Sequence, residues 1–162
     1  MKTLILVRHA KSSWEYAVGD KDRPLLHSGI NDAISVADTF NDRAVEIDAI
    51  FSSPANRALH TAMIFCRQLY FPLQRFQVTA ELYDFSGNDV LGFIKNLGSD
   101  LNTVMVFGHN HAFTYIANSL GNTYIDNVPT SGLVHLQFQV DDWSSVAKGT
   151  TKQTIFPKEI RG

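Results

Sequence analysis

The feature that most limits the possible folds is a set of short apolar runs that stop abruptly at polar or charged residues. Thr3–Val7 stops at Arg8, and Thr103–Phe107 stops at Gly108. Short continuous apolar runs of this kind are typical of strands that are buried on both faces. Between them lie segments with apolar residues at three- and four-residue spacing, which predicts amphipathic helices. This alternation of strands and helices predicts an α/β layered domain with a mostly parallel sheet.

The next predicted elements continue the alternation. A second strand is expected at 47–51, followed by a helix with Ser53 as its N-cap and Pro54 in its first turn. Ser28 is expected to cap an earlier helix, because a serine side chain accepts hydrogen bonds from free N–H groups at a helix start. Further along, the pattern predicts a weak strand at 76–79, a helix over 90–97, and a helix over 113–120 that ends at Gly121.

The last part of the chain has a different pattern. Val134–Val140 alternates apolar and polar side chains, which predicts a strand with one face exposed to water. Lys152–Phe156 is expected to pair with it as a hairpin and to form an antiparallel edge. The complete prediction is a three-layer α/β/α domain with a mostly parallel central sheet and an antiparallel edge strand.

Length and composition favour one globular domain. The chain has 162 residues, close to a typical domain of about 150 residues, so we expect one domain over 1–162. Apolar residues make up 44% of the chain and charged residues 19%, which excludes the disordered and fibrous classes. The net charge is -2, whereas a general nucleic-acid binder carries a basic excess. Any anion site must therefore be a local concentration of positive charge.

The sequence predicts a cytoplasmic protein without a membrane segment. The apolar run Leu4–Val7 stops at Arg8 and is shorter than the roughly 7–15 apolar residues of a signal peptide. No stretch approaches the roughly 18 apolar residues of a membrane span. Cys66, the one cysteine, has no partner for an internal disulfide, which favours a reducing compartment.

Chemically active side chains follow three of the predicted strands. Arg8 and His9 follow the first strand, Arg57 follows the second, and His109 follows the strand at 103–107. Ligands of open α/β sheets gather at the carboxyl ends of the strands. The sequence therefore predicts that two arginines and two histidines meet at one edge of the sheet.

This combination is suited to phosphoryl chemistry. A guanidinium donates paired hydrogen bonds to phosphate oxygens and stays charged, so two arginines suit a tetrahedral dianion. Cationic neighbours disfavour protonation, so His9 is expected to be neutral near neutral pH and able to attack phosphorus. His109 is expected to donate a hydrogen bond to a phosphoryl oxygen. The guanidinium groups supply positive charge, so the predicted site has no metal and no cofactor.

Three segments resemble the signature of the histidine phosphatase, or phosphoglycerate-mutase-like, superfamily. They are Arg-His-Ala at 8–10, Ser-Ser-Pro-Ala-Asn-Arg at 52–57 and Gly-His-Asn at 108–110. The resemblance implies a phosphoglycerate-mutase-like fold. It also implies that His9 becomes transiently phosphorylated while Arg8, Arg57 and His109 bind the phosphoryl group. Alanine at position 10, in place of the family's glycine, is similar to the short SixA-like branch, whose members dephosphorylate phosphohistidine.

Other residues are weaker candidates for the site. Many superfamily members place a carboxylate after the third strand to protonate the leaving group, and Glu81 lies at a comparable position. Lys11 and Ser12 follow the first strand and are candidate phosphate donors. His109 and His111 are two positions apart, a spacing that some metal sites use, but no aspartate or cysteine cluster accompanies them in the sequence.

The prediction is a metal-independent phosphatase that acts through phospho-His9, with protein phosphohistidine as the substrate. One alternative is a phosphatase or mutase for small phosphomonoesters. A second alternative is a phosphohistidine-binding module without turnover. The expected partner is a phosphorylated protein or a small phosphorylated metabolite, and the oligomeric state stays open.

Overall fold

The computed structural model describes residues 1–161. A single β-sheet lies at its centre. Within these residues the sheet has six strands in the order β3-β2-β4-β1-β5-β6. The strands are β1 (Lys2–Arg8), β2 (Ala49–Ser52), β3 (Phe76–Val78), β4 (Thr103–Gly108), β5 (Leu133–Phe138) and β6 (Thr150–Ile155). The four strands from β3 to β1 are parallel, and β5 pairs antiparallel with both β1 and β6. The mostly parallel sheet with an antiparallel edge is confirmed.

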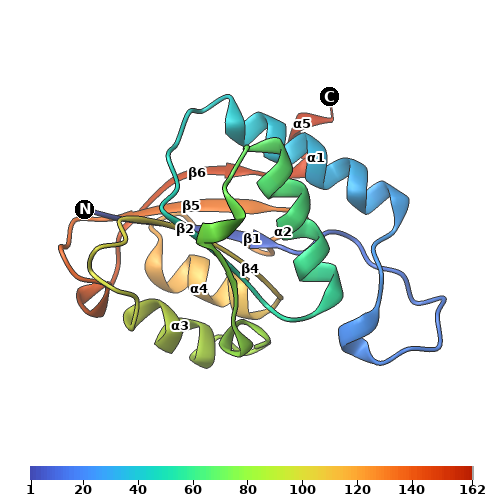
Figure 1. Ribbon diagram of the computed structural model, residues 1–162. Helices are drawn as coiled ribbons and strands as arrows, with labels where there is room; N and C mark the ends of the chain where they lie inside the picture. The colour runs from blue at the N-terminus through green and yellow to red at the C-terminus, as the bar shows by residue number, and fades with distance from the viewer. Residues whose placement is uncertain (162) are drawn as a thin grey trace.

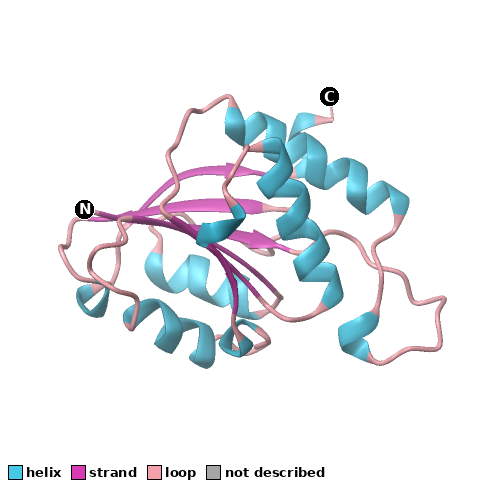
Figure 2. Ribbon diagram, viewed as in Figure 1, coloured by secondary structure: helices cyan, strands magenta, loops and turns pink. Residues whose placement is uncertain are grey.

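Helices cover both faces of the sheet, which makes three layers (Figure 1, Figure 2). The α-helices α1 (His27–Asn41), α2 (Asn56–Gln68) and α5 (Pro157–Ile160) lie on one face, and α3 (Asn88–Lys95) and α4 (Ala112–Leu120) lie on the other. Short 3-10 segments occupy the connections: η1 (Asp20–Asp22), η2 (Leu73–Arg75), η3 (Ala80–Leu82) and η4 (Trp143–Ser145). None of the helices in the described part of the chain is long and apolar enough to cross a bilayer.

Strand β1 shows why the apolar runs are continuous. Successive side chains of a strand point to opposite faces, so Leu4 and Leu6 join the core under α3 and α4, while Ile5 and Val7 join the core under α1 and α2. All four side chains are fully buried. A strand between two helical layers therefore has no position for a polar side chain until it reaches the sheet edge.

Both predicted helix caps are wrong. Ser28 lies inside α1, whose N-cap position is Leu26 and has no side-chain cap bond. Ser53 and Pro54 precede α2, whose N-cap position is Ala55. The Ser53 hydroxyl accepts the Ala55 N–H at 3.2 Å and also bonds a distant side chain of the site. The side chain of this serine therefore bonds to a residue far away in the sequence, and helix-cap propensity, which considers only neighbouring residues, does not predict that bond.

The prediction that β5 exposes one face to water is also wrong. His135 on that strand is only 6% exposed, and its Nδ1 accepts a hydrogen bond from the Gln153 side chain on β6 at 2.9 Å. Leu133, on the same face of β5, belongs to the core under α1. His135 is therefore covered by the neighbouring strand instead of by solvent, while Gln137 stays partly exposed.

Candidate active site

The carboxyl ends of three parallel strands meet at one edge of the sheet, beside the first turn of α2 (Figure 1). In the register, Arg8 of β1 lies beside Gly108 of β4, and Ser52 of β2 lies beside Phe107 of β4. The residues that follow each strand therefore come together. This register brings Arg8, His9, Arg57 and His109 to the same edge of the sheet, as the sequence predicts.

A cavity of about 440 Å³ opens at this edge. Its lining comes from the ends of β1, from the connection to α1, from α2, and from the loops before α3 and β5: Arg8, His9, Lys11, Ser12, Trp14, Asp20, Arg23, Leu26, Arg57, Phe85 and Thr130. Six of the seven predicted site residues reach the cavity or contact its wall; Glu81 is the exception.

The backbone around His9 is held by both neighbouring connections. The His9 N–H donates to the Gly108 carbonyl at 3.0 Å, and the Arg8 N–H donates to the Gly132 carbonyl at 3.0 Å. The Ser131 N–H donates to the carbonyls of Arg8 and His9, each at 3.1 Å. These bonds fix the position from which the His9 ring projects, and Ser131 was not a candidate from the sequence.

The His9 imidazole has one nitrogen engaged and one free for chemistry. Nδ1 lies 2.7 Å from the Ala10 carbonyl oxygen. Because a carbonyl only accepts, Nδ1 carries the proton and Nε2 carries the lone pair. Burial, together with the positive charges of Arg57, Arg8 and Arg23, lowers the pKa of His9 to about 4. The ring is therefore neutral at physiological pH, the form needed for nucleophilic attack.

His109 lies beside His9, and the centroids of the two rings are 5.3 Å apart. Its Nε2 is 2.8 Å from the Ser53 hydroxyl, and its buried Nδ1 has no hydrogen-bond partner among the described residues. Burial, then the cationic form of His9, lowers the pKa of His109 to about 3. When Ser53 donates its O–H to Nε2, the proton of the neutral ring lies on Nδ1. The ring then presents a buried N–H donor beside His9.

The two arginines reach the site from different elements. Arg8 Nη1 donates to the Val128 carbonyl at 2.9 Å. Arg57, in the first turn of α2, is only 3% exposed and donates to the backbone carbonyl and side chain of Asp20. In each guanidinium the buried Nε has no partner within residues 1–161. Unpartnered buried donors are costly, and three of them belong to the three residues predicted to bind the phosphoryl group.

Lys11 and Ser12 both line the cavity. Lys11 is exposed, so its ammonium group is free to meet a ligand that enters from solvent. The Ser12 hydroxyl already accepts a hydrogen bond from the Arg23 guanidinium. Arg23 also donates from Nε to the Ser13 carbonyl at 3.1 Å, so it tethers this loop.

Glu81 does not lie in the site. It is exposed on η3, does not line the cavity, and accepts a hydrogen bond from the Thr79 hydroxyl. That bond lowers the pKa of Glu81, so the carboxylate is ionised at neutral pH and has no proton to donate. The short η3 turn buries Leu82 and directs Glu81 outward. These contacts do not support Glu81 as the general acid.

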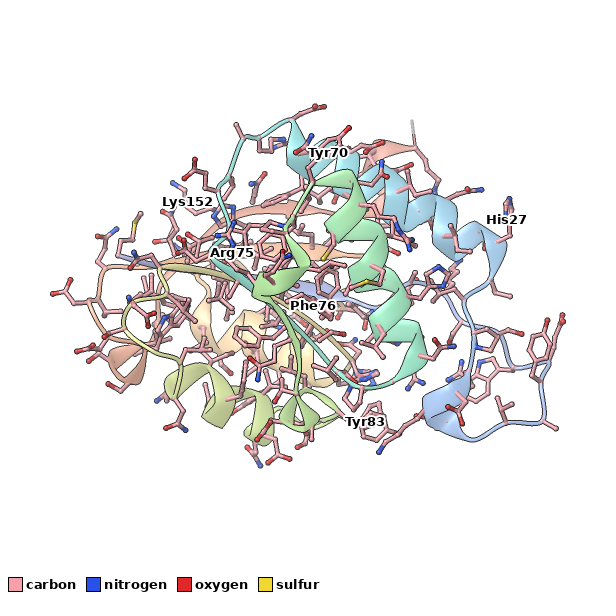
Figure 3. The ribbon with its side chains drawn as sticks, viewed as in Figure 1. His27, Tyr70, Arg75, Phe76, Tyr83 and Lys152 are labelled. Carbon is pink, nitrogen blue, oxygen red and sulfur yellow. The ribbon has the colours of Figure 1, made fainter. Side chains whose placement is uncertain are left out.

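The structure adds Asp20 and Phe85, which the sequence did not single out, and places them beside Tyr83, a sequence candidate for the rim of the cleft. Asp20 contacts Arg57 and accepts a hydrogen bond from the Tyr83 hydroxyl at 2.6 Å. The Tyr83 and Phe85 rings pack against the His109 ring, with centroid distances of 5.4 Å and 4.8 Å. Figure 3 shows Tyr83 on the side of the molecule where the η1 connection lies. Asp20 lies in a stretch without periodicity, so its position gave no sequence signal.

Within residues 1–161, His109 and His111 belong to no cluster of metal-binding side chains. Among the described residues, no three His, Cys, Asp or Glu side chains are grouped closely enough to hold an ion. His111 lies exposed at the start of α4.

Comparison with known proteins assigns the family. The sequence model of the histidine phosphatase superfamily (branch 1) matches residues 4–95. This match covers more than half of the chain. The chain therefore belongs to the histidine phosphatase superfamily.

The fold is shared with solved members. The structure of the protein histidine phosphatase SixA complexed with tungstate matches with a TM-score of 0.83 at 23% identity, over 98% of this chain and 99% of that chain. A mycobacterial glucosyl-3-phosphoglycerate phosphatase matches with a TM-score of 0.68 at 14% identity, over 96% and 98% of the two chains. An uncharacterized protein of Mycobacterium tuberculosis is 27% identical over 153 residues, 88% of this chain and 93% of the relative. The predicted phosphoglycerate-mutase-like fold is confirmed.

Proposed function

We propose that this phosphatase hydrolyses the phosphohistidine of another protein through a covalent phosphoryl intermediate on His9. The main support is the arrangement around one nitrogen. His9 Nε2 is unprotonated because Nδ1 donates its hydrogen to the Ala10 carbonyl, and the ring centroids of His9 and His109 lie 5.3 Å apart. Arg8 and Arg57 line the same cavity. The nucleophile, a neutral hydrogen-bond donor and two guanidiniums therefore surround one position.

The proposed reaction has two displacements. The Nε2 lone pair of His9 attacks phosphorus, and the P–N bond of the substrate breaks as its imidazole leaves with the electron pair. Water then attacks phospho-His9, which breaks the new P–N bond, releases orthophosphate and returns the lone pair to Nε2. Arg8, Arg57 and the Nδ1–H of His109 stabilise the negative charge on the phosphoryl oxygens in both steps. Because the guanidiniums supply the positive charge, we propose that no metal ion takes part.

The leaving group favours phosphohistidine over an alkyl phosphate. An alkoxide needs a proton donor as it leaves, and Glu81, the expected donor, is exposed and ionised. The P–N bond of phosphohistidine is labile, and its imidazole can be protonated from solvent before it leaves. The cavity is open at the sheet edge, where a side chain of another protein could enter. The shared fold with SixA is consistent with this assignment.

Phosphate release from a panel of substrates tests this function. With micromolar enzyme, we expect rapid release from a protein phosphorylated on histidine and much slower release from sugar phosphates, with or without a chelator. Preferential hydrolysis of sugar phosphates would make the protein a small-molecule phosphatase. Binding without release would make it a phosphohistidine-binding module. Loss of activity with the chelator, restored by a divalent ion, would contradict the metal-free mechanism.

The low pKa of His9 predicts an unusual pH dependence. Protonation removes the Nε2 lone pair, so attack by His9 should be lost as the pH falls through about 4 instead of through the ordinary 6.5. The imidazole signals of His9, assigned by their absence in His9→Ala, should report the same midpoint in an NMR titration. A midpoint near 6.5 would show that burial and the arginines do not keep this ring neutral.

A further inference from the structure

The second arginine of the site is already paired with a carboxylate. Arg57 Nη2 donates to Asp20 Oδ2 at 2.9 Å, and Arg57 Nη1 donates to the Asp20 backbone carbonyl at 2.6 Å. Both terminal nitrogens of this guanidinium thus point to one residue. Asp20 lies 37 positions earlier in the sequence, on η1 in the long connection between β1 and α1.

Two other side chains hold the Asp20 carboxylate in place. The Tyr83 hydroxyl donates to Oδ2 at 2.6 Å, and Arg23 Nη1 lies 3.4 Å from Oδ1. These bonds, with that of Tyr83 the largest cause, lower the pKa of Asp20 to about 2, so the carboxylate is charged throughout the physiological range. Asp20 lines the cavity together with His9 and Arg57. A fixed negative charge therefore lies where the proposed function requires a phosphoryl dianion to bind.

The two anions compete for the same guanidinium. Asp20 takes one hydrogen bond from each terminal nitrogen of Arg57, which leaves Nε and the second hydrogen of each terminal nitrogen as donors for a phosphoryl group. A carboxylate that stays paired with Arg57 offsets its positive charge and repels the dianion, so phosphate binds more strongly when Asp20 moves away. The Asp20 side chain is 43% exposed, whereas that of Arg57 is 3% exposed. The carboxylate can therefore move toward water, while the arginine is held in the wall of the cavity.

We infer that Asp20 sets the affinity of this site for phosphate by competing with phosphoryl oxygens for the Arg57 guanidinium. This role rests on the proposed function. Its consequence is weak binding of orthophosphate, the product, which has no further contacts to offset the loss of the Asp20 pair. A phosphorylated protein that also contacts the rim of the cavity is expected to displace Asp20 more readily than orthophosphate does.

Calorimetric titration with orthophosphate tests this role. Asp20→Asn keeps the size of the side chain and removes its charge, and we expect it to bind orthophosphate about fivefold more tightly than the wild type. A fivefold change in the dissociation constant corresponds to the upper end of the free energy that a partly exposed ion pair contributes. Tyr83→Phe removes the strongest bond to the carboxylate without changing its charge. This second variant should shift the affinity in the same direction by about twofold, and it serves if Asp20→Asn fails to fold.

Asp22→Asn is the matched control. Asp22 is exposed on the same η1 segment, and within residues 1–161 its side chain makes no ion pair. Equal gains in both variants would reduce the effect to net charge and overturn the inference. Weaker phosphate binding in Asp20→Asn would show that Asp20 positions Arg57 for the ligand, which also overturns it.

The titration separates this inference from the proposed function. If the wild type releases phosphate from phosphohistidine but Asp20→Asn binds orthophosphate no more tightly, only the role of Asp20 fails. If neither protein binds orthophosphate and neither releases it from a substrate, the phosphoryl site itself is wrong. Product inhibition gives a second readout, because the inhibition constant of orthophosphate should fall in Asp20→Asn by the same factor as its dissociation constant.

Discussion

Replacing His9 with alanine should reduce phosphate release by about 10⁴-fold or more, the scale of losing a catalytic nucleophile. Alanine has no nitrogen to attack phosphorus, and no other imidazole can take its place: the one beside it, His109, is fully buried with its Nε2 bonded to Ser53. Binding of a phosphate analogue such as tungstate should survive in part, because Arg8, Arg57 and His109 remain. Rapid-quench labelling with a ³²P-phosphohistidine protein should show an acid-labile label on the wild type and none on His9→Ala.

His27→Ala is the control for this variant. His27 is exposed at the start of α1, and Figure 3 shows its side chain pointing away from the body of the molecule. It should keep the wild-type rate and the transient label. A His9→Ala variant with a near wild-type rate would eliminate the covalent mechanism.

Replacing Arg57 with alanine should lower kcat by about two orders of magnitude or more, the scale for one lost transition-state donor. Arg57 donates from a buried position, where its charge is less screened than in water. Arg57→Lys should recover little of the rate, because an ammonium group cannot present the planar pair of donors. Steady-state and single-turnover rates on the phosphohistidine protein measure both effects.

Arg67→Ala is the matched control on the same helix. Arg67 lies exposed in the last turn of α2, so its loss removes the same charge far from the cavity. Thermal unfolding of each variant separates a loss of rate from a loss of fold. If Arg57→Ala kept a rate within a few-fold of Arg67→Ala, the guanidinium would have no part in the chemistry.

Much of the site could be predicted because the residues sit at the ends of buried strands. Strands β1 and β4 lie between two helical layers, so their apolar runs are continuous and their ends are sharp. Parallel neighbours in a sheet end at the same edge, which brings Arg8, His9 and His109 together without knowledge of any loop. The chemistry of two arginines and two histidines then indicated a phosphoryl group.

The errors fall where a side chain's direction depends on distant residues. Glu81 and Tyr83 are two positions apart on one turn, yet Glu81 faces solvent and Tyr83 reaches Asp20. The Ser53 hydroxyl meets His109, which is 56 positions away, and this contact replaces the predicted helix cap. His135 alternates with apolar residues, as a residue on an exposed face would, but its Nδ1 accepts a hydrogen bond from Gln153 on the neighbouring strand.

Local pattern was thus enough for the order of strands and helices, the edge at which the site lies and the four residues proposed to act on phosphorus. Those features depend on periodicity and on strand ends, which any short stretch of chain displays. The pairing of Asp20 with Arg57, the tautomer of His9 and the exposure of Glu81 became known only from the folded chain. The Asp20–Arg57 pair joins residues 37 positions apart, which no local pattern records. The tautomer and the exposure depend on the direction of the backbone at Ala10 and at the η3 turn, and the packing of the folded chain sets both directions.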